Sequence, residues 1–559
     1  MPSSATVITT TDGLRLAVQV SGPEGAPVVV AVHGYPDDHT VWDGVVGELV
    51  ATHRVATYDV RGAGASDAPG ERAGYGIERL AADLRAVVDE VSPGAPVHLL
   101  AHDWGSTQAW HAVTHGALDG RVASFTSISG PAREHVAAFY RRARRRDRLR
   151  QALASWYMLL FRAPVLPELG WRSGLIGAVM SRRAGVPRPR TADAVRGLEL
   201  YRENIGGPVG APVRTDVPVQ VLAPADDPFV TPALQTQIAP YVDDLRVRTV
   251  PGGHWLPRER PDVVARCVRE LAAHVDGAAE TPSLRRARTV AKGLGHWAGR
   301  VVVVTGAGSG IGRAVAHAFG RRGALVVAAD LNLATAQETA FETGGLAYEV
   351  DVSDGAAMAA FADRVAAEAG VPDVVVNNAG IAVSGPFADT GVEDWEAILD
   401  VNLWGVIHGC RLFGAQLREH GEGGHIVNVA SAAAFTPVAG LPAYCTTKSA
   451  VLMLSECLRA ELAGQGIGVT ALCPAFVPTD IVSSARMVGV DESTASEQRR
   501  SANALILRRN YPLSKVAERV VRAVERDVAL APVTPEAHVA LALSRLTPGL
   551  LRAAARIGQ

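Results

Sequence analysis

The chain has 559 residues, 48% of them hydrophobic, and a formal net charge of -2 at pH 7. This length is too great for one hydrophobic core and predicts two domains, while the near-neutral charge gives no reason to expect nucleic-acid binding. The five cysteines lack CxxC spacing and indicate neither a disulfide framework nor a metal site. Because no signal-like or transmembrane run is present, we expect a cytoplasmic protein.

The first half alternates strands with helices. Residues 14–20 are predicted to form a half-exposed strand, and 28–32, 54–58 and 97–101 form buried strands, with a helix over 77–91. This alternation predicts an α/β fold with a mostly parallel sheet.

Asp103 follows the strand at 97–101, with small residues two positions before and after it, Ala101 and Gly105. The pattern is typical of a nucleophile elbow, a sharp turn that presents its central residue above the sheet. An aspartate there attacks an electrophilic carbon to give an ester that water hydrolyses, which favours an epoxide or an alkyl halide as substrate. The alternative is an aspartate that caps the next helix.

Two later strands place an acid and a histidine. The strand at 218–223 leads to Asp226 and Asp227, and the strand at 245–250 leads to His254. The chain order nucleophile, acid, histidine is that of an α/β-hydrolase. His254 would activate water against the ester, and Asp227 would orient its imidazole, with Asp226 as the alternative acid.

Between residues 129 and 216 the strands give way to arginine-rich helical sequence. Tyr157 and Tyr201 lie there, and phenols can stabilise and protonate an epoxide oxygen, although both could be packing residues only. The basic run 141–150 predicts a solvated helix face, a contact with anionic lipid, or attraction of an anionic substrate. The apolar stretches 156–161 and 166–171 favour a hydrophobic substrate.

Residues 1–275 resemble the epoxide hydrolases of the α/β-hydrolase fold, through HGYP (33–36) and HDWG (102–105). The resemblance implies a lid over about 130–216 and an oxyanion hole from the backbone amides of Tyr35 and Trp104. It matches Tyr157 and Tyr201 to the family's pair of epoxide-binding tyrosines and implies no cofactor. Haloalkane dehalogenases, which share the Asp-Trp elbow but hold the halide with indole or amide donors, are the alternative.

Residues 276–297 are small, polar and basic, without a sustained apolar period, and predict a linker. The second domain, 298–559, opens with VVVVTGAGSGIG (301–312), a buried strand and a glycine-rich turn that can bring the backbone close to a dinucleotide pyrophosphate. Asp330 ends the next strand, where a carboxylate binds the adenosine ribose and repels a 2′-phosphate. NAD is therefore favoured over NADP.

A second catalytic group follows. Tyr444 and Lys448 are four residues apart, on one face of a predicted helix. The phenol would exchange a proton with the substrate oxygen, and the ammonium would lower its pKa and bind the nicotinamide ribose. Ser431 would hold the substrate oxygen, and Asn402 would position water in a proton path.

Residues 298–530 resemble the short-chain dehydrogenase/reductase family through TGAGSGIG, NNAG and YCTTK. The resemblance implies a Rossmann-type doubly wound parallel sheet, a secondary alcohol or ketone substrate and a homo-oligomer. The family's Pro-Gly is Pro474-Ala475 here, which leaves that loop's contact with nicotinamide open. The implied cofactor-binding residues are Gly306, Ser309, Gly310, Ile311, Gly312, Asp330, Asp351, Val352, Asn378, Ala379, Gly380, Tyr444, Lys448, Pro474, Val477 and Thr479.

The whole chain resembles actinobacterial fusions of these two families. We hypothesise a bifunctional enzyme that hydrolyses an epoxide to a vicinal diol and oxidises a secondary alcohol or reduces a ketone, with the diol passing from the first site to the second. The alternative is that one half is catalytically silent and serves as a binding or assembly module.

Overall fold

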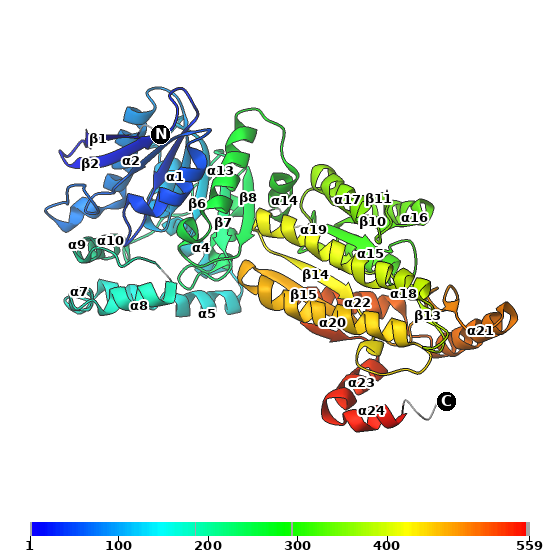
Figure 1. Ribbon diagram of the computed structural model, residues 1–559. Coiled ribbons are helices and arrows are strands. Elements are labelled where there is room, and N and C mark those ends of the chain that lie inside the picture. The colour runs from blue at the N-terminus through cyan, green and yellow to red at the C-terminus, as the bar shows by residue number, and fades with distance from the viewer. Residues whose placement is uncertain (1–2, 185, 292–294, 555–559) are drawn as a thin grey trace. The chain divides into compact units, whose positions relative to one another are not determined.

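The computed structural model describes residues 3–184, 186–291 and 295–554 and divides the chain into two compact units, Met1–Gly293 and Leu294–Gln559 (Figure 1). Each unit is built on one large sheet with helices packed against it. The predicted α/β fold is therefore confirmed in both halves. Within the described residues, every helix is too short or too polar to cross a bilayer.

The first unit contains an eight-stranded sheet in the order β1-β2-β4-β3-β5-β6-β7-β8. β1 pairs antiparallel with β2 and β2 with β4, and the remaining pairs are parallel. The central strands are buried on both faces because they are runs of valine, leucine and alanine. The strands are β1 (Ser3–Thr9), β2 (Arg15–Ser21), β3 (Val28–Val32), β4 (Arg54–Tyr58), β5 (Val97–His102), β6 (Val122–Ile128), β7 (Val219–Pro224) and β8 (Leu245–Val250).

Helices with one apolar face pack against this sheet. α2 buries Leu80, Leu84 and Val88, which recur at the spacing of one helix face. The helices outside the segment between β6 and β7 are η1 (His39–Trp42), α1 (Asp43–Leu49), η2 (Arg72–Tyr75), α2 (Ile77–Val91), α3 (Trp104–Thr114), α11 (Pro232–Thr236), η3 (Ala239–Tyr241), α12 (Leu256–Glu259), α13 (Pro261–Val275) and α14 (Pro282–Ala291).

The segment between β6 and β7 is helical, and we call residues 133–204 the lid. Its Phe161, Trp171 and Tyr201 form one apolar cluster with Tyr35 and Trp104. This cluster packs the lid over the loops that follow β3 and β5. The lid helices are α4 (Arg133–Arg142), α5 (Arg145–Ala154), α6 (Tyr157–Arg162), α7 (Leu166–Arg172), α8 (Leu175–Ala184), α9 (Thr191–Arg196) and α10 (Leu198–Asn204).

The stretch predicted as a linker, 276–297, contains helix α14, which packs against β8. Over Pro282–Arg288, the part of α14 whose burial is described, the buried residues are Leu284 and Ala287, at 0% and 3% exposed. Three residues apart, they form a narrow apolar stripe in a basic, small-residue background, which is why no apolar period was evident in the sequence.

The second unit contains a seven-stranded sheet, all parallel, in the order β11-β10-β9-β12-β14-β15-β17. The strand order reverses between β9 and β12, the point at which such sheets bind ligands at the carboxyl ends of their strands. A separate parallel pair joins β13 to β16. The strands are β9 (Val301–Thr305), β10 (Leu325–Asp330), β11 (Leu346–Glu349), β12 (Val374–Asn377), β13 (Val383–Ser384), β14 (Gly424–Val429), β15 (Ile467–Cys473), β16 (Arg486–Met487) and β17 (Leu530–Pro532).

Helices of the second unit connect these strands. α15 and α22 pack against each other, and α20 packs against β15. The helices are α15 (Gly310–Gly320), α16 (Leu333–Thr343), α17 (Gly355–Glu368), α18 (Val392–Leu399), η4 (Asp400–Trp404, a π-helical turn), α19 (Gly405–His420), η5 (Ala432–Ala434), α20 (Pro442–Leu462), η6 (Ala463–Gln465), α21 (Glu492–Arg509), α22 (Leu513–Glu525), α23 (Pro535–Leu546) and α24 (Pro548–Ala554).

Helix α14 should contribute to the stability of the first unit. Leu284→Ala should lower the free energy of unfolding of that unit by about 2 to 4 kcal/mol, because the leucine is fully buried. Urea unfolding of the full chain, monitored through hydrogen exchange of the β8 amides, measures the change in the free energy of unfolding. Leu331→Ala, at a position 67% exposed, is the matched control and should have little effect. An equal response of the two variants would show that α14 does not stabilise the unit.

Candidate active sites

Asp103 lies at the sharp turn between β5 and α3, with φ of 51° and ψ of -126°. This backbone conformation is strained for a residue with a side chain. Small neighbours make room for the turn, since a Cβ atom at Gly130 would overlap the Asp103 carbonyl oxygen and one at Gly105 would overlap the Val32 carbonyl oxygen. The local sequence therefore forms the elbow that its spacing predicted.

The two carboxylate oxygens of Asp103 have different partners. The backbone amide of Tyr35 donates to Oδ1 at 2.8 Å, and the amide of Trp104 also donates to the carboxylate. His254 Nε2 lies 3.5 Å from Oδ2. Burial alone would raise the pKa of Asp103, but His254 and the backbone donors lower it. Asp103 is thus ionised and held by the two predicted oxyanion-hole amides.

His254 is placed between two carboxylates. Its Nδ1 lies 3.0 Å from Asp227 Oδ2, and Asp227 Oδ1 accepts from the amides of Phe229 and Val230 at 2.8 and 2.9 Å. Asp226 is exposed. Of the two acids that the sequence left open, the structure places Asp227 beside His254.

The charge of this group sets the protonation of the histidine. Burial opposes protonation, but Asp227 and Asp103 outweigh it and raise the pKa of His254 to about 10. His254 is therefore protonated at neutral pH while Asp103 is ionised. If an ester formed at Asp103, that negative charge would disappear and the pKa of His254 would fall, which would free the imidazole to accept a proton from water.

The lid brings Tyr157 and Tyr201 over this group. The ring centroid of Tyr201 lies 5.1 Å from that of Trp104 and 6.2 Å from that of Tyr157. The phenols of Tyr157 and Tyr201 are hydrogen-bonded to each other. Burial, with a contribution from the negative charge of Asp103, raises the pKa of both tyrosines. Both hydroxyls are consequently neutral donors near Asp103.

Two residues of this site were not evident in the sequence. Gln151, on the inner side of α5, donates to the Phe229 carbonyl at 2.9 Å and accepts from the Thr231 amide at 2.8 Å, which ties the lid to the Asp227 loop. His102 is fully buried, and its Nε2 donates to the His254 carbonyl at 2.8 Å. A glutamine directly after a basic run gives no sequence signal, and His102 was noted only as part of HDWG.

In the second unit, the glycine turn after β9 packs tightly. Gly306 has φ of 63°, and a Cβ atom there would lie 2.9 Å from the Ala379 Cα atom, while one at Gly312 would overlap the Gly306 carbonyl. Asn378 Nδ2 donates to the carbonyls of Thr305 and Gly306 at 2.9 and 3.1 Å. The turn is thus fixed with α15 beginning at Gly310, so that the first amides of this helix are available to a phosphate.

The other predicted cofactor residues surround this turn. Asp330 Oδ2 accepts from the Gly308 amide at 2.8 Å, and a Cβ atom at Gly310 would lie 3.1 Å from Thr479 Cγ2. Asp351 Oδ1 accepts from the Ser353 amide at 2.9 Å. Ser309 precedes the first residue of α15, Ile311 lies in its first turn, Val352 and Val477 are buried, and the Pro474 carbonyl accepts from the Ala432 amide at 2.8 Å. This arrangement fits a dinucleotide.

Tyr444 and Lys448 lie in α20, as their spacing predicted. Lys448 Nζ donates to the Val429 carbonyl at 3.0 Å and lies 5.7 Å from the Tyr444 ring centroid. Burial lowers the pKa of Lys448 to about 8. Burial also raises the pKa of Tyr444, and a hydrogen bond with Ser431 opposes this rise. The expected lowering of the Tyr444 pKa by Lys448 is not found, since burial of the phenol has the largest effect.

Asn402 is fully buried in the π-helical turn between α18 and α19. It accepts from the Ile381 amide at 2.8 Å and donates to the Ile381 carbonyl at 3.0 Å. A Cβ atom at Gly380 would lie 3.1 Å from Asn402 Oδ1 and 3.5 Å from Lys448 Nζ, so the two side chains share one neighbourhood. The structure thus brings Asn402, Lys448, Tyr444 and Ser431 together.

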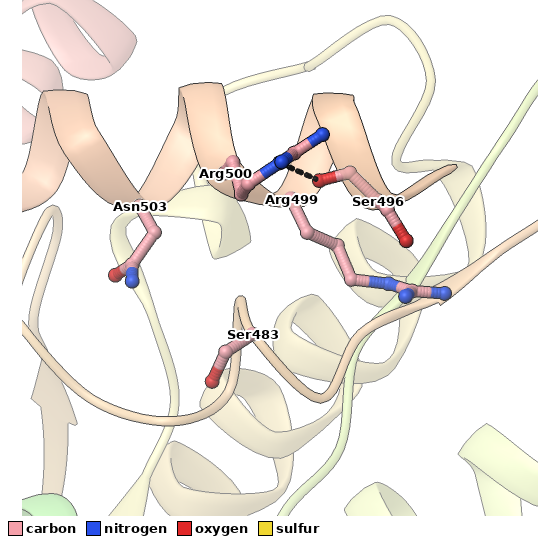
Figure 2. Close-up of a pocket in the computed structure, with 5 residues that line it drawn as sticks. All are labelled: Ser483, Ser496, Arg499, Arg500 and Asn503. Carbon is pink, nitrogen blue, oxygen red and sulfur yellow. Dashed lines mark hydrogen bonds between the residues drawn. The ribbon is translucent and has the colours of Figure 1, made fainter. Parts of the chain in front are cut away.

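Residues 481–512, which follow the predicted cofactor residue Thr479, include β16 and all of α21. Figure 2 shows a pocket in this segment. Its volume is about 420 Å³, and its lining contains none of the predicted catalytic residues. Arg500 Nε donates to the Ser496 carbonyl at 3.3 Å, and Arg499 forms an ion pair with Glu492 at 3.0 Å. The lining residues are Ser483, Ser496, Arg499, Arg500 and Asn503.

Comparisons with known proteins match both units. Residues 27–261 match the family model "alpha/beta hydrolase fold", and residues 300–487 match "short chain dehydrogenase". "Probable oxidoreductase EphD" of Mycobacterium tuberculosis (strain ATCC 25618 / H37Rv) is 42% identical over 576 residues, which cover 98% of this chain and 97% of that protein. "D-threitol dehydrogenase" of Mycolicibacterium smegmatis is 40% identical over 188 residues, 33% of this chain and 72% of that protein.

A solved structure described as "Novel epoxide hydrolases belonging to the alpha/beta hydrolases superfamily in metagenomes from hot environments" is 25% identical. It covers 49% of this chain and 99% of that chain, with a TM-score of 0.42.

The pKa of His254 should depend on the charge of Asp103. In the unchanged protein, an NMR titration should show His254 keeping its proton through neutral pH and losing it near pH 10. Asp103→Asn removes a negative charge and should lower this pKa. Asp226→Asn, at an exposed position that does not contact the histidine, should leave it unchanged. An unaltered pKa in Asp103→Asn would contradict the coupling of the two groups.

Proposed function

Since the chain belongs to the family of the EphD oxidoreductases and joins an alpha/beta hydrolase fold to a short chain dehydrogenase, we propose that it is a bifunctional enzyme that hydrolyses epoxides and oxidises alcohols. Both units belong to enzyme families, and the second takes a nicotinamide cofactor. The observation that carries the hydrolase proposal is the Asp103–His254–Asp227 group beneath two neutral tyrosines. Its substrate would be hydrophobic, because the lid residues around the tyrosines are apolar.

The first chemical step uses Asp103 and the tyrosines. A carboxylate oxygen of Asp103 attacks an epoxide carbon, the carbon–oxygen bond of the ring breaks, and Tyr157 or Tyr201 donates a proton to the departing oxygen. The product is a hydroxyalkyl ester of Asp103. The high pKa of both phenols suits this step, because each still carries its proton at neutral pH.

The second step uses His254. With the charge of Asp103 removed, the pKa of His254 falls, and its proton returns to the phenolate that the first step produced. The neutral imidazole then accepts a proton from water, and the hydroxide attacks the ester carbonyl. The amides of Tyr35 and Trp104 stabilise the negative oxygen of the tetrahedral intermediate. The diol leaves, and Asp103 regains a carboxylate that contains one oxygen from water.

In the second unit we assign the proton transfer to Tyr444. Because burial raises the pKa of Tyr444, its phenol keeps its proton at neutral pH and would donate that proton to the oxygen of a ketone during reduction. In the oxidation of a secondary alcohol, the phenol must first lose its proton, and the phenolate would then accept the hydroxyl proton. Ser431, which is hydrogen-bonded to Tyr444, would hold the same oxygen. A bound nicotinamide would accept the hydride from the carbon that bears this hydroxyl. Lys448 supplies positive charge beside Tyr444, and Asn402 holds the backbone of Ile381 next to the group.

We propose that the two activities act in sequence. Epoxide hydrolysis gives a vicinal diol, and oxidation of one hydroxyl gives a hydroxyketone. Similarity to a dehydrogenase named for threitol supports this order, because threitol carries neighbouring hydroxyl groups. The connection of both units in one chain is a second support.

Two further proposals concern the location of the protein and its oligomeric state. None of the five cysteines, all of which the structure describes, forms a disulfide, which supports a reducing, cytoplasmic location. We also propose a homo-oligomer formed through the dehydrogenase unit, which static light scattering would measure.

Variants that remove one activity should separate the two steps. Asp103→Asn should lower epoxide hydrolysis by roughly 10³-fold or more, since it removes the nucleophile, yet should still form NADH from added diol. Tyr444→Phe should accumulate diol from epoxide and lose about 10²- to 10⁴-fold in NADH formation. Chromatography of the diol and absorbance of NADH follow both steps.

Four results would contradict parts of this proposal. Halide release from a haloalkane, without diol formation from epoxides, would establish the dehalogenase alternative. Diol accumulation without NADH in the unchanged enzyme would disprove the sequential order. Full epoxide hydrolysis by Asp103→Asn would show that Asp103 is not the nucleophile. Full NADH formation by Tyr444→Phe would show that Tyr444 does not transfer the proton.

The carboxylate of Asp330 should select NAD. Asp330→Ser should shift the ratio of kcat/KM for NAD to that for NADP by about tenfold or more toward NADP, because a 2′-phosphate would no longer meet a negative charge. Steady-state kinetics with both cofactors measure the ratio. Glu338→Gln, an exposed charge on α16, is the control and should leave it unchanged. If Asp330→Ser also left it unchanged, NAD preference would not depend on Asp330.

A further inference from the structure

The lid carries exposed apolar side chains that neither active site uses. In the rest of the first unit that the structure describes, the large exposed apolar residues are Val7, Val209 and Val213. In the lid they are concentrated within residues 149–179, and soluble monomers rarely expose a large contiguous apolar patch without a function. We call this set the lid face: Leu149, Leu153, Trp156, Leu159, Val165, Leu166, Leu169, Leu175 and Val179, each between 47% and 74% exposed.

The fold directs these side chains away from the catalytic group. On α5, Gln151 is 1% exposed and holds the Asp227 loop, whereas Leu149 and Leu153, two residues to either side of it, are 60% and 68% exposed. Leu166 and Leu169 on α7 and Leu175 and Val179 on α8 recur at spacings of one helix face. α7 packs against α8, and Figure 1 shows α5, α7 and α8 along the same edge of this unit.

Positive charge accompanies this apolar surface. Residues 141–190 contain thirteen arginines and two acidic residues, in a chain whose net charge is -2. Arg144, Arg145, Arg146 and Arg150 of the basic run are exposed, and none of them forms an ion pair with the described acidic residues. The partner of this surface should therefore be negatively charged as well as apolar.

We propose that the lid face docks the protein on a bilayer surface that contains anionic lipid. Short helices with leucine and tryptophan on one side insert shallowly at the boundary between headgroups and acyl chains. The exposed arginines bind lipid phosphates, each contributing electrostatic attraction near the surface. A second copy of the chain is a poorer occupant, because it would bring two strongly positive lids together.

Docking through this face would place the lid between the bilayer and Asp103. Trp156 and Leu159, both exposed, flank Tyr157, whose phenol lies near Asp103. An apolar substrate dissolved in the membrane would then approach Asp103 from the lid side. The docking does not rest on the proposed chemistry, since it depends only on the exposed leucines, tryptophan and arginines.

Sedimentation of the full chain with vesicles tests the proposal. The protein should sediment with vesicles of equal parts phosphatidylcholine and phosphatidylglycerol, sediment little with phosphatidylcholine alone, and be partly released by high salt. The triple variant Leu153→Ser, Leu159→Ser and Leu166→Ser should bind the mixed vesicles roughly tenfold more weakly or worse, because apolar area is lost.

The matched control is Val7→Ser, Leu331→Ser and Phe341→Ser, which changes exposed apolar residues outside the lid. It should bind as the unchanged protein does, and both triple variants should keep the unfolding profile of that protein. Equal binding by the two triple variants, or no sedimentation with mixed vesicles, would overturn the proposal. The unchanged protein could instead be a dimer in light scattering and fail to bind vesicles. If the lid variant alone were then a monomer, the lid face would join two copies of the chain.

Discussion

The first unit depends on one buried arrangement of charges, the imidazolium of His254 between the carboxylates of Asp103 and Asp227. A buried charge is costly unless it is paired and hydrogen-bonded, and here each carboxylate also accepts from backbone amides. The three residues follow β5, β7 and β8, so the parallel sheet brings their loops to one edge. The strain at Asp103 and the attachment of the lid by Gln151 both serve to hold this group.

In the second unit, the residues of the candidate site meet at a topological switch point of the sheet. The glycine turn follows β9, Asn378 follows β12, Ser431 follows β14 and Pro474 follows β15, so residues far apart in the chain meet at the carboxyl ends of a parallel sheet. Asn378 fixes the turn, and Asn402 fixes the backbone at Ile381. The dehydrogenase residues are thus positioned by amide side chains bound to backbone, whereas the hydrolase residues are positioned by charge.

Much of this could be predicted from the sequence because the signals are local. Valine-rich strands, the glycine turn, the elbow around Asp103 and the spacing of Tyr444 and Lys448 depend on residues close together in the chain. The rest depends on contacts between distant residues. Asp227 could not be distinguished from Asp226 without the position of His254. Helix α14 was missed because, among its residues whose burial is described, only Leu284 and Ala287 are buried. The lid face and the direction of the Tyr444 pKa both depend on burial, which the sequence does not reveal.

The account of the first unit rests on Asp103 as the nucleophile, and one measurement tests it most directly. A single turnover of the protein with an epoxide in ¹⁸O-water, followed by mass spectrometry of the peptide that contains Asp103, shows where the water oxygen goes. The ester mechanism predicts ¹⁸O in the Asp103 carboxylate and none in the first diol released. Label in the diol, with an unlabelled Asp103, would mean direct attack by water and would contradict the account.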